Sequence, residues 1–254
     1  MLFYIIRHGK PDYKMNTLLP EGKAQAELAA KRLSKRKFKA IYSSPYGRAV
    51  ETARPLSEKL GLSIQIEDWA YELGEESKCT LEDGTKELLS HLPGTYYHQE
   101  KFLGLSVEES FHRVDMLTPS FKERYENIAA GVDSLLARNG YSRNEAETYD
   151  VIRGNSDRIA LFCHGGMERV MLSHIFHIPY QFLAQSLQVP FTGITVLYFP
   201  EKPEDGPLKA DNTETENRST ETDAVMPVIY MLGDIGHLSE EADLCRHYIS
   251  GEVL

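Results

Sequence analysis

The stretch Leu2-Phe3-Tyr4-Ile5-Ile6-Arg7-His8-Gly9 decides the fold, because a short apolar run stops abruptly at arginine, histidine and glycine. A second stretch, Asp157-Arg-Ile-Ala-Leu-Phe-Cys163-His164-Gly165-Gly166, has the same form. Both runs are too short for ordinary helices and are rich in β-branched and aromatic residues, which predicts two buried strands. Each predicted strand is therefore followed by a His-Gly pair.

Helical and strand patterns alternate around these two stretches. Residues 21–36 have the spacing of an amphipathic helix. Ser44 and Pro45 predict the start of a second helix, with Ser44 as its N-terminal cap, and Gly61 predicts its end. Strands are also predicted at 39–44, 62–66, 192–199 and 225–232, and a helix at 167–177. This alternation predicts an α/β fold, a three-layer α/β/α sandwich with a mainly parallel sheet.

The middle of the chain has a different character. Between residues 73 and 155 we find no strand pattern, and helical spacing from Phe121 to Leu136 predicts an inserted, mostly helical cap. The core of a single domain would then comprise residues 1–72 and 156–254. Residues 201–223 hold eight acids, three bases and no Val, Ile, Met or aromatic residue, which predicts a disordered loop.

Composition excludes several classes of protein. The chain carries 38 acidic and 28 basic side chains and a net charge of −10, which argues against a nucleic-acid-binding protein. No apolar run approaches the ~20 residues of a membrane helix. The three cysteines are too widely spaced for a disulfide framework or a zinc knuckle. We therefore expect a cytoplasmic protein without nucleic-acid or membrane partners; its oligomeric state stays open.

Charged and nucleophilic side chains converge at one edge of the predicted sheet, since ligands bind beyond the carboxyl ends of parallel strands. His8 and His164 follow two such strands, and Arg48 lies in the first turns of a helix that follows a third. Arginine binds phosphate oxygens bidentately, and a neutral histidine can attack phosphorus. Glu72 follows the strand at 62–66 and is the candidate proton donor. The pattern predicts a site for a phosphoryl group.

The ordered set of motifs resembles the histidine phosphatase superfamily, which has the phosphoglycerate-mutase-like fold. The pieces that carry the resemblance are Arg7-His8-Gly9, Leu19-x-x-Gly22-x-x-Gln25-Ala26, Ser43-Ser44-Pro45-x-x-Arg48-Ala49-x-x-Thr52-Ala53, Glu72, His164-Gly165-Gly166 and Gly233-Asp234-x-x-His237-Leu238. They lie at the beginning and the end of the chain. After the first His-Gly the family often has Glu-Ser/Thr and an asparagine close by. Here the chain reads Lys10-Pro11-Asp12-Tyr13, with Asn16 displaced, so Asn16 is assigned no role.

The resemblance implies roles for individual residues. It implies that His8 is the phosphorylated nucleophile and that Glu72 protonates the leaving group and then activates water. It implies that the phosphoryl group is held by Arg7, His8, Arg48, His164 and Gly165. It implies neither a metal nor an organic cofactor. The expected activity is hydrolysis of a small phosphorylated metabolite through a phosphohistidine.

Three alternatives remain open from the sequence. A phosphoglycerate-type mutase should have basic residues around the acid, whereas residues 71–76 are acidic, which favours hydrolysis. A non-catalytic phospho-ligand or protein-binding module on the same fold is disfavoured by the intact set of histidines and arginines. A metallohydrolase would use His8, His164 and acids, although no His-Glu-x-x-His occurs. The cap carries no motif, so the sequence does not select among phosphorylated substrates.

Overall fold

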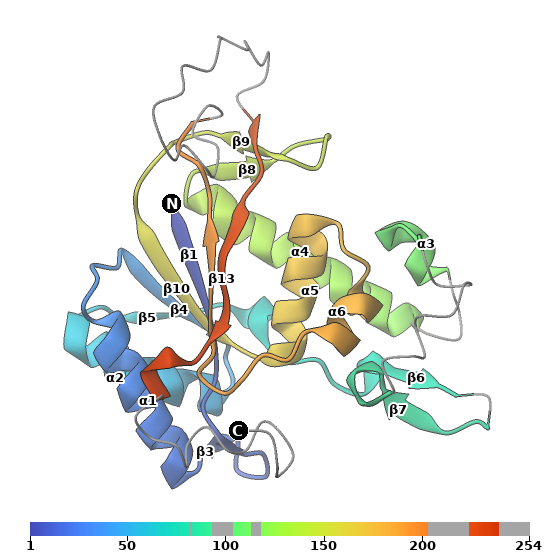
Figure 1. Cartoon of the computed structure of the whole chain (residues 1–254), viewed down its shortest axis with the longest axis horizontal. Helices are drawn as coiled ribbons and strands as arrows, with labels where there is room; N and C mark the ends of the chain where they lie inside the picture. The colour runs from blue at the N-terminus through green and yellow to red at the C-terminus, as the bar shows by residue number, and fades with distance from the viewer. Residues whose placement is uncertain (82, 93–103, 113–117, 203–223, 239–254) are drawn as a thin grey trace.

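A six-stranded sheet forms the centre of the computed structural model, which describes residues 1–81, 83–92, 104–112, 118–202 and 224–238 (Figure 1). Its strand order is β13-β11-β1-β10-β4-β5. The pairs β1–β10, β10–β4 and β4–β5 are parallel, whereas β11 is antiparallel to both β1 and β13. The strands are β1 Leu2–Arg7, β4 Ala40–Ser43, β5 Ile64–Ile66, β10 Arg158–Cys163, β11 Ile194–Tyr198 and β13 Val228–Asp234. The predicted, mainly parallel sheet is confirmed.

The two central strands are buried on both faces. Phe3 and Ile5 of β1 belong to one hydrophobic cluster, and Ile6 belongs to a second cluster on the opposite face. Leu161 and Phe162 of β10 divide between the same two clusters. Because successive side chains of a strand point to opposite faces, a strand covered on both sides is apolar throughout. This is why the two deciding stretches are continuous apolar runs.

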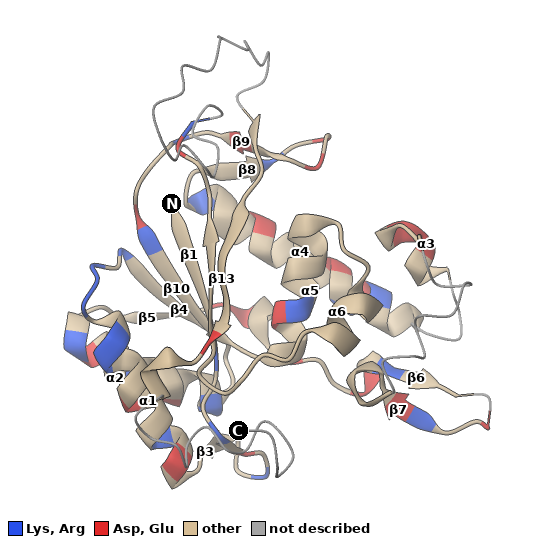
Figure 2. Ribbon diagram, in the orientation of Figure 1, with Lys and Arg blue, Asp and Glu red and all other residues tan. Residues whose placement is uncertain are grey.

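Helices cover both faces of the sheet, as a three-layer sandwich requires (Figure 1). Helices α1 (Pro20–Leu33) and α2 (Gly47–Leu60) lie on one face, and α4 (Pro119–Arg138) and α5 (Gly165–Phe176) lie on the other. The shorter helices α3 (Val107–Phe111) and α6 (Tyr180–Ser186) lie on the side of α4 and α5. Figure 2 shows the central strands in tan over most of their length, with the charges mainly on helices and connections.

The range 73–155 contains short strands that the sequence did not predict. Strands β6 (Lys78–Thr80) and β7 (Lys86–Leu88) form one hairpin, and β8 (Tyr141–Arg143) and β9 (Tyr149–Val151) form another. Three residues are too few to display a period-two pattern, which explains why they were missed. Helix α4 shares a hydrophobic cluster with β1 and β10 and packs against α5. The division into core and cap at residue 73 stays a prediction.

Two predicted boundaries are wrong. Helix α2 begins at Gly47 with Tyr46 as its N-cap, so Ser44 does not cap it. The predicted strand 225–232 is divided into β12 (Ala224–Val225), which pairs with β9, and β13. Pro227 lies between them, and proline lacks the N–H that a continuous strand pairing requires. The remaining elements are hairpin β2 (Pro11–Asp12) and β3 (Thr17–Leu18) and the 3₁₀ turns Asp68–Ala70, Glu75–Ser77, Leu89–His91 and Gly236–Leu238.

Two further predictions from the sequence concern a disordered loop and the absence of a membrane-spanning helix. Apart from its first two residues, the predicted disordered loop 201–223 lies outside the described residues, as does Cys245. Of the helices in the described ranges, none is long and apolar enough to span a bilayer.

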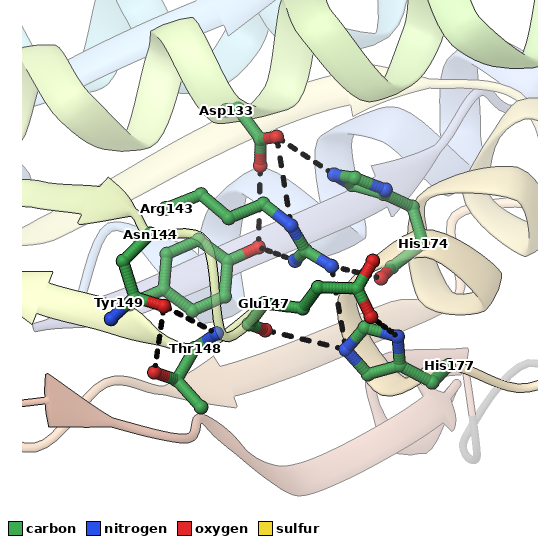
Figure 3. Close-up of polar contacts among 8 residues, drawn as sticks. All are labelled: Asp133, Arg143, Asn144, Glu147, Thr148, Tyr149, His174 and His177. Carbon is green, nitrogen blue, oxygen red and sulfur yellow. Dashed lines mark hydrogen bonds and ion pairs between the residues drawn. The ribbon is translucent and has the colours of Figure 1, made fainter.

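A polar network joins α4, the C-terminal end of α5 and the β8–β9 hairpin (Figure 3). Asp133 of α4 accepts a hydrogen bond from Nε2 of His174 of α5 at 2.8 Å. The guanidinium of Arg143 donates to the hydroxyl of Tyr149 at 3.1 Å and to the backbone oxygen of His174 at 3.4 Å. Nδ1 of His177 lies 3.1 Å from the carboxylate of Glu147. These histidines therefore belong to a structural network.

Gly131 of α4 packs closely against Trp69, and this contact predicts how a substitution at Gly131 changes the free energy of unfolding. A Cβ atom on Gly131 would lie 2.2 Å from Cδ2 of Trp69. Alanine is favoured over glycine inside a helix by about 1 kcal/mol, whereas overpacking a core costs about 1–3 kcal/mol. Because the 2.2 Å contact puts the overpacking cost toward the upper end of that range, we expect Gly131→Ala to lower the free energy of unfolding by up to about 2 kcal/mol in urea denaturation.

The matched control places the same substitution in a Trp69→Leu background, where the indole is absent. There Gly131→Ala should be neutral or stabilising, because only the gain in helix propensity remains. Stabilisation by Gly131→Ala in the otherwise unchanged chain would contradict the packing described.

Candidate active site

His8 follows β1 and is oriented by its own backbone neighbourhood. Its side chain is buried, and its backbone N–H donates to the carbonyl of Cys163 at 2.9 Å. Nδ1 lies 2.7 Å from the carbonyl oxygen of Gly9, which can only accept, so Nδ1 carries the proton. Burial, and then the charge of Arg7, hold the pKa of His8 well below its usual value. The imidazole is therefore neutral near pH 7, with a lone pair on Nε2.

The backbone after His8 is fixed by close contact with α1 and α2. A Cβ on Gly9 would lie 2.5 Å from the carbonyl oxygen of Gly22 in α1, so only glycine fits. The N–H of Gly9 donates to Oγ1 of Thr52 at 3.0 Å, and that hydroxyl donates to the carbonyl of Arg48 at 2.7 Å. Gly22 and Thr52, which belong to the sequence motifs quoted above, thus hold the peptide on which the orientation of His8 depends.

Arg48 reaches the same edge of the sheet from the first turn of α2. Its guanidinium donates to Oδ1 of Asn16 at 2.8 Å and lies 4.7 Å from the centre of the Tyr46 ring. Asn16 has φ of 54°, a left-handed conformation that asparagine tolerates better than most residues. The displaced asparagine therefore still contacts an arginine of the site, which its sequence position gave no reason to assign.

His164 follows β10, and its ring centre lies 5.1 Å from that of His8. Its Nε2 lies 2.7 Å from the hydroxyl of Ser44, whereas its buried Nδ1 has no hydrogen-bond partner within the described ranges. Burial first, and then the nearby His8, lower the pKa of His164 well below its usual value. If Ser44 donates to Nε2, the proton of the neutral ring is on Nδ1.

Glu72 lies at the N-terminus of α5. Its carboxylate accepts backbone hydrogen bonds from Gly166 at 3.3 Å and Met167 at 3.0 Å. A Cβ on Gly166 would lie 2.7 Å from Oε1 of Glu72, so the second glycine of His164-Gly165-Gly166 admits the carboxylate. Glu72 lines one pocket together with Arg7 and Gly165. The neighbouring acids Glu75 and Glu76 do not line it.

The structure also brings to the site residues for which the sequence gave no signal. The ring of Phe191 lies 4.3 Å from the guanidinium carbon of Arg7 and 5.6 Å, centre to centre, from the ring of His8. The backbone N–H of Thr192 donates to the carbonyl of Arg7 at 3.0 Å, and its hydroxyl lies 2.9 Å from Nε2 of His237. These residues come from the connection before β11, which carries no recognisable motif.

Two further residues lie beside this site. Burial raises the pKa of the Cys163 thiol well above its usual value, so it stays protonated and unreactive. The carboxyl of Glu168 is fully buried, and burial raises its pKa to about 7. Over the part of the chain that the structure describes, no group of three or more His, Cys, Asp or Glu side chains is placed to hold a metal ion.

Comparison with known proteins identifies the family to which this chain belongs. The model of the histidine phosphatase superfamily (branch 1) matches residues 3–205. A Hydrogenobacter thermophilus protein with the provisional name phosphoserine phosphatase 2 is 33% identical over an alignment of 145 positions, and the match covers 49% of this chain and 69% of that protein. The chain belongs to the histidine phosphatase superfamily, branch 1.

Solved structures share the fold. A phosphoserine phosphatase mutant from Entamoeba histolytica, in complex with phosphoserine, has a TM-score of 0.55 at 16% identity, over 93% of this chain and 98% of that chain. Bacillus stearothermophilus YhfR has a TM-score of 0.54 at 16% identity, with the same coverage. At this level of identity the two structures support the fold alone.

The contact between Ser44 and His164 gives a prediction for catalysis. Ser44→Ala removes the hydroxyl bonded to Nε2 and leaves that buried nitrogen without its partner, which costs about 1–3 kcal/mol. We expect kcat/KM for p-nitrophenyl phosphate to fall about 10- to 100-fold, since 1.36 kcal/mol is a factor of ten. The imidazole ¹⁵N shifts of His164 should report a change in tautomer.

Ser43→Ala is the matched control, because Ser43 is equally buried and its hydroxyl donates to the carbonyl of Ser44 rather than to His164. The Ser43→Ala substitution should leave the imidazole ¹⁵N chemical shifts of His164 unchanged. Equal losses of kcat/KM and unchanged tautomers in both variants would show that Ser44 does not position His164.

Proposed function

We propose that this protein is a phosphomonoester hydrolase that acts on a small phosphorylated metabolite through a covalent phosphohistidine at His8. The observation that carries the proposal is the buried, neutral imidazole of His8, whose Nδ1 proton is held by the carbonyl of Gly9. A histidine in this state presents a nucleophilic lone pair on Nε2. Membership in a family of phosphatases supports the same activity.

In the first half-reaction the side chains of Arg7, Arg48 and His164 and the N–H of Gly165 bind the phosphoryl oxygens. Nε2 of His8 attacks phosphorus while the bond to the ester oxygen breaks. Charge on the transferring group is stabilised by donors that are already in position, which is the largest effect available to such a site. Glu72 supplies the proton that the leaving oxygen needs.

In the second half-reaction the carboxylate of Glu72 accepts a proton from water, which attacks the phosphorus of phosphohistidine. The P–N bond breaks, inorganic phosphate leaves, and His8 regains its lone pair. The backbone N–H groups of Gly166 and Met167 orient the carboxylate in both steps.

The proposal extends to cofactor and compartment. No step requires a metal ion, so activity is proposed to persist with excess chelator. Cys79 and Cys163 are free thiols, and free cysteines are typical of a reducing compartment, so we place the protein in the cytoplasm.

His8→Ala should abolish turnover of phosphomonoesters, because the nucleophile is missing while the surrounding contacts remain. The unchanged chain, quenched during turnover of ³²P-labelled substrate, should carry label that is lost in acid and stable in base, as a phosphoramidate is. His112→Ala is the control, because His112 is an exposed histidine outside the pocket. Label on His8→Ala, or label that survives acid and is lost in base, would contradict the mechanism.

The role of Glu72 depends on the leaving group. An alkoxide needs a proton to leave and nitrophenolate does not, so Glu72→Gln should slow phosphorylation by alkyl phosphates by about 10²–10⁴-fold. Phosphorylation by p-nitrophenyl phosphate should change far less. The measurement is a single-turnover burst with each substrate, because Glu72 also acts in the shared dephosphorylation step.

Glu75→Gln is the matched control, because the Glu75 side chain is 84% exposed and does not line the pocket. Its bursts should equal those of the unchanged chain. Equal impairment of the two bursts in Glu72→Gln would remove Glu72 from the acid role and direct the test to Glu76 and Asp68.

A further inference from the structure

Arg169 lines the same pocket as Arg7 and Glu72, and the proposed mechanism gives it no role. It lies on α5, about one helical turn after Gly165, and is only 8% exposed. Its Nε donates to the carbonyl of Leu187 at 2.7 Å, and the guanidinium of Arg7 donates to the carbonyl of Val189. One short segment of chain, residues 187–189, therefore anchors both guanidinium groups.

A single pocket contains both arginines. Its volume is about 380 Å³, and its lining includes Arg7, Glu72, Leu73, Arg169 and Gln188. This volume is near the lower end of the range of about 300–1,000 Å³ typical of small-molecule sites. A substrate with its phosphoryl group at Arg7 therefore has room for a short carbon skeleton that extends toward Arg169.

Against the larger effect of burial, the phenol of Tyr180 and the carboxyl groups of Glu72 and Glu168, among the described residues, raise the pKa of Arg169, but none of them is in direct contact with its guanidinium. Within the described ranges no ion pair or side-chain hydrogen bond joins Arg169 to Asp or Glu. The Glu72 carboxylate is held by the backbone of α5, and the adjacent Glu168, whose pKa burial raises to about 7, is only partly ionised at neutral pH. Burial lowers the pKa of Arg169, which shows the cost of keeping this charge away from water.

A buried guanidinium that has its Nε anchored and its two Nη groups available is suited to a planar anion, which it binds by two parallel hydrogen bonds. We propose that Arg169 binds a carboxylate of the substrate. The substrate is then a phosphomonoester of a small hydroxy acid, with phosphate and carboxylate at opposite ends of a short skeleton. This inference rests on the proposed phosphatase activity.

The test compares substrates that differ in the carboxylate. 3-Phosphoglycerate is paired with glycerol 3-phosphate, and phosphoserine with phosphoethanolamine, and the ratio of kcat/KM is measured within each pair. We expect the unchanged chain to prefer the carboxylated member. Arg169→Met should lower this ratio about 10- to 100-fold, as loss of a charge-assisted bidentate contact does. Arg169→Lys should give an intermediate ratio, because lysine keeps the charge without the planar fork.

The ratio distinguishes loss of carboxylate recognition from general damage to the site, because a distorted site lowers kcat/KM for both substrates of a pair. Arg54→Met is the control, because Arg54 is an exposed arginine of α2 outside the pocket, and it should keep the ratio. A ratio near one in the unchanged chain, or an unaltered ratio in a folded Arg169→Met, would overturn the proposal.

A binding measurement keeps this inference distinct from the proposed function. If the unchanged chain hydrolyses no phosphomonoester, the phosphatase proposal fails, and calorimetric titration with 3-phosphoglycerate and glycerol 3-phosphate still reports on Arg169. Tighter binding of 3-phosphoglycerate that is lost in Arg169→Met would support the carboxylate contact. Equal binding of the two compounds would overturn it.

Discussion

The parallel pairing of β1 with β10 is the constraint on which the site depends. The register places Arg7 opposite Cys163, so both strands end at the same level and the histidine that follows each one emerges beside the other. The backbone hydrogen bond from His8 to Cys163 extends the pairing by one residue into the site. A slip of one residue would turn every side chain of β1 to the opposite face, which the two buried clusters prevent.

Burial of positive charge at one edge of the sheet has an energetic consequence for substrate binding. Burial lowers the pKa of His8, and the charges of Arg7 and Arg48 act in the same direction. Mutual repulsion and desolvation both oppose this arrangement, and a bound dianion relieves both. Substrate binding is therefore expected to stabilise the folded protein as well as to prepare the reaction.

Continuously apolar strands could be predicted from the sequence, whereas three-residue strands and a single contact between residues distant in sequence could not. The strands that end at Arg7 and Cys163 were predictable because burial on both faces makes them continuously apolar. The three-residue strands β6 to β9 show no pattern at that length. Ser44 was predicted to be a helix cap because serine before proline usually is one, yet its hydroxyl contacts His164, a residue distant in sequence.

The candidate site residues also fall into two groups, those that the sequence marks and those that only the structure shows. Arg7, His8, Arg48, Glu72 and His164 could be selected because motifs and strand ends mark them, and the structure places them at one edge of the sheet; their roles stay proposals. Phe191, Asn16 and Arg169 could not be selected, since only the folded chain shows which segment lies beside which strand.

The contact between Gly9 and Gly22 has one more consequence, for the course of sequence divergence. Backbone meets backbone there, so no compensating change of a neighbouring side chain can restore the fit once either glycine is replaced.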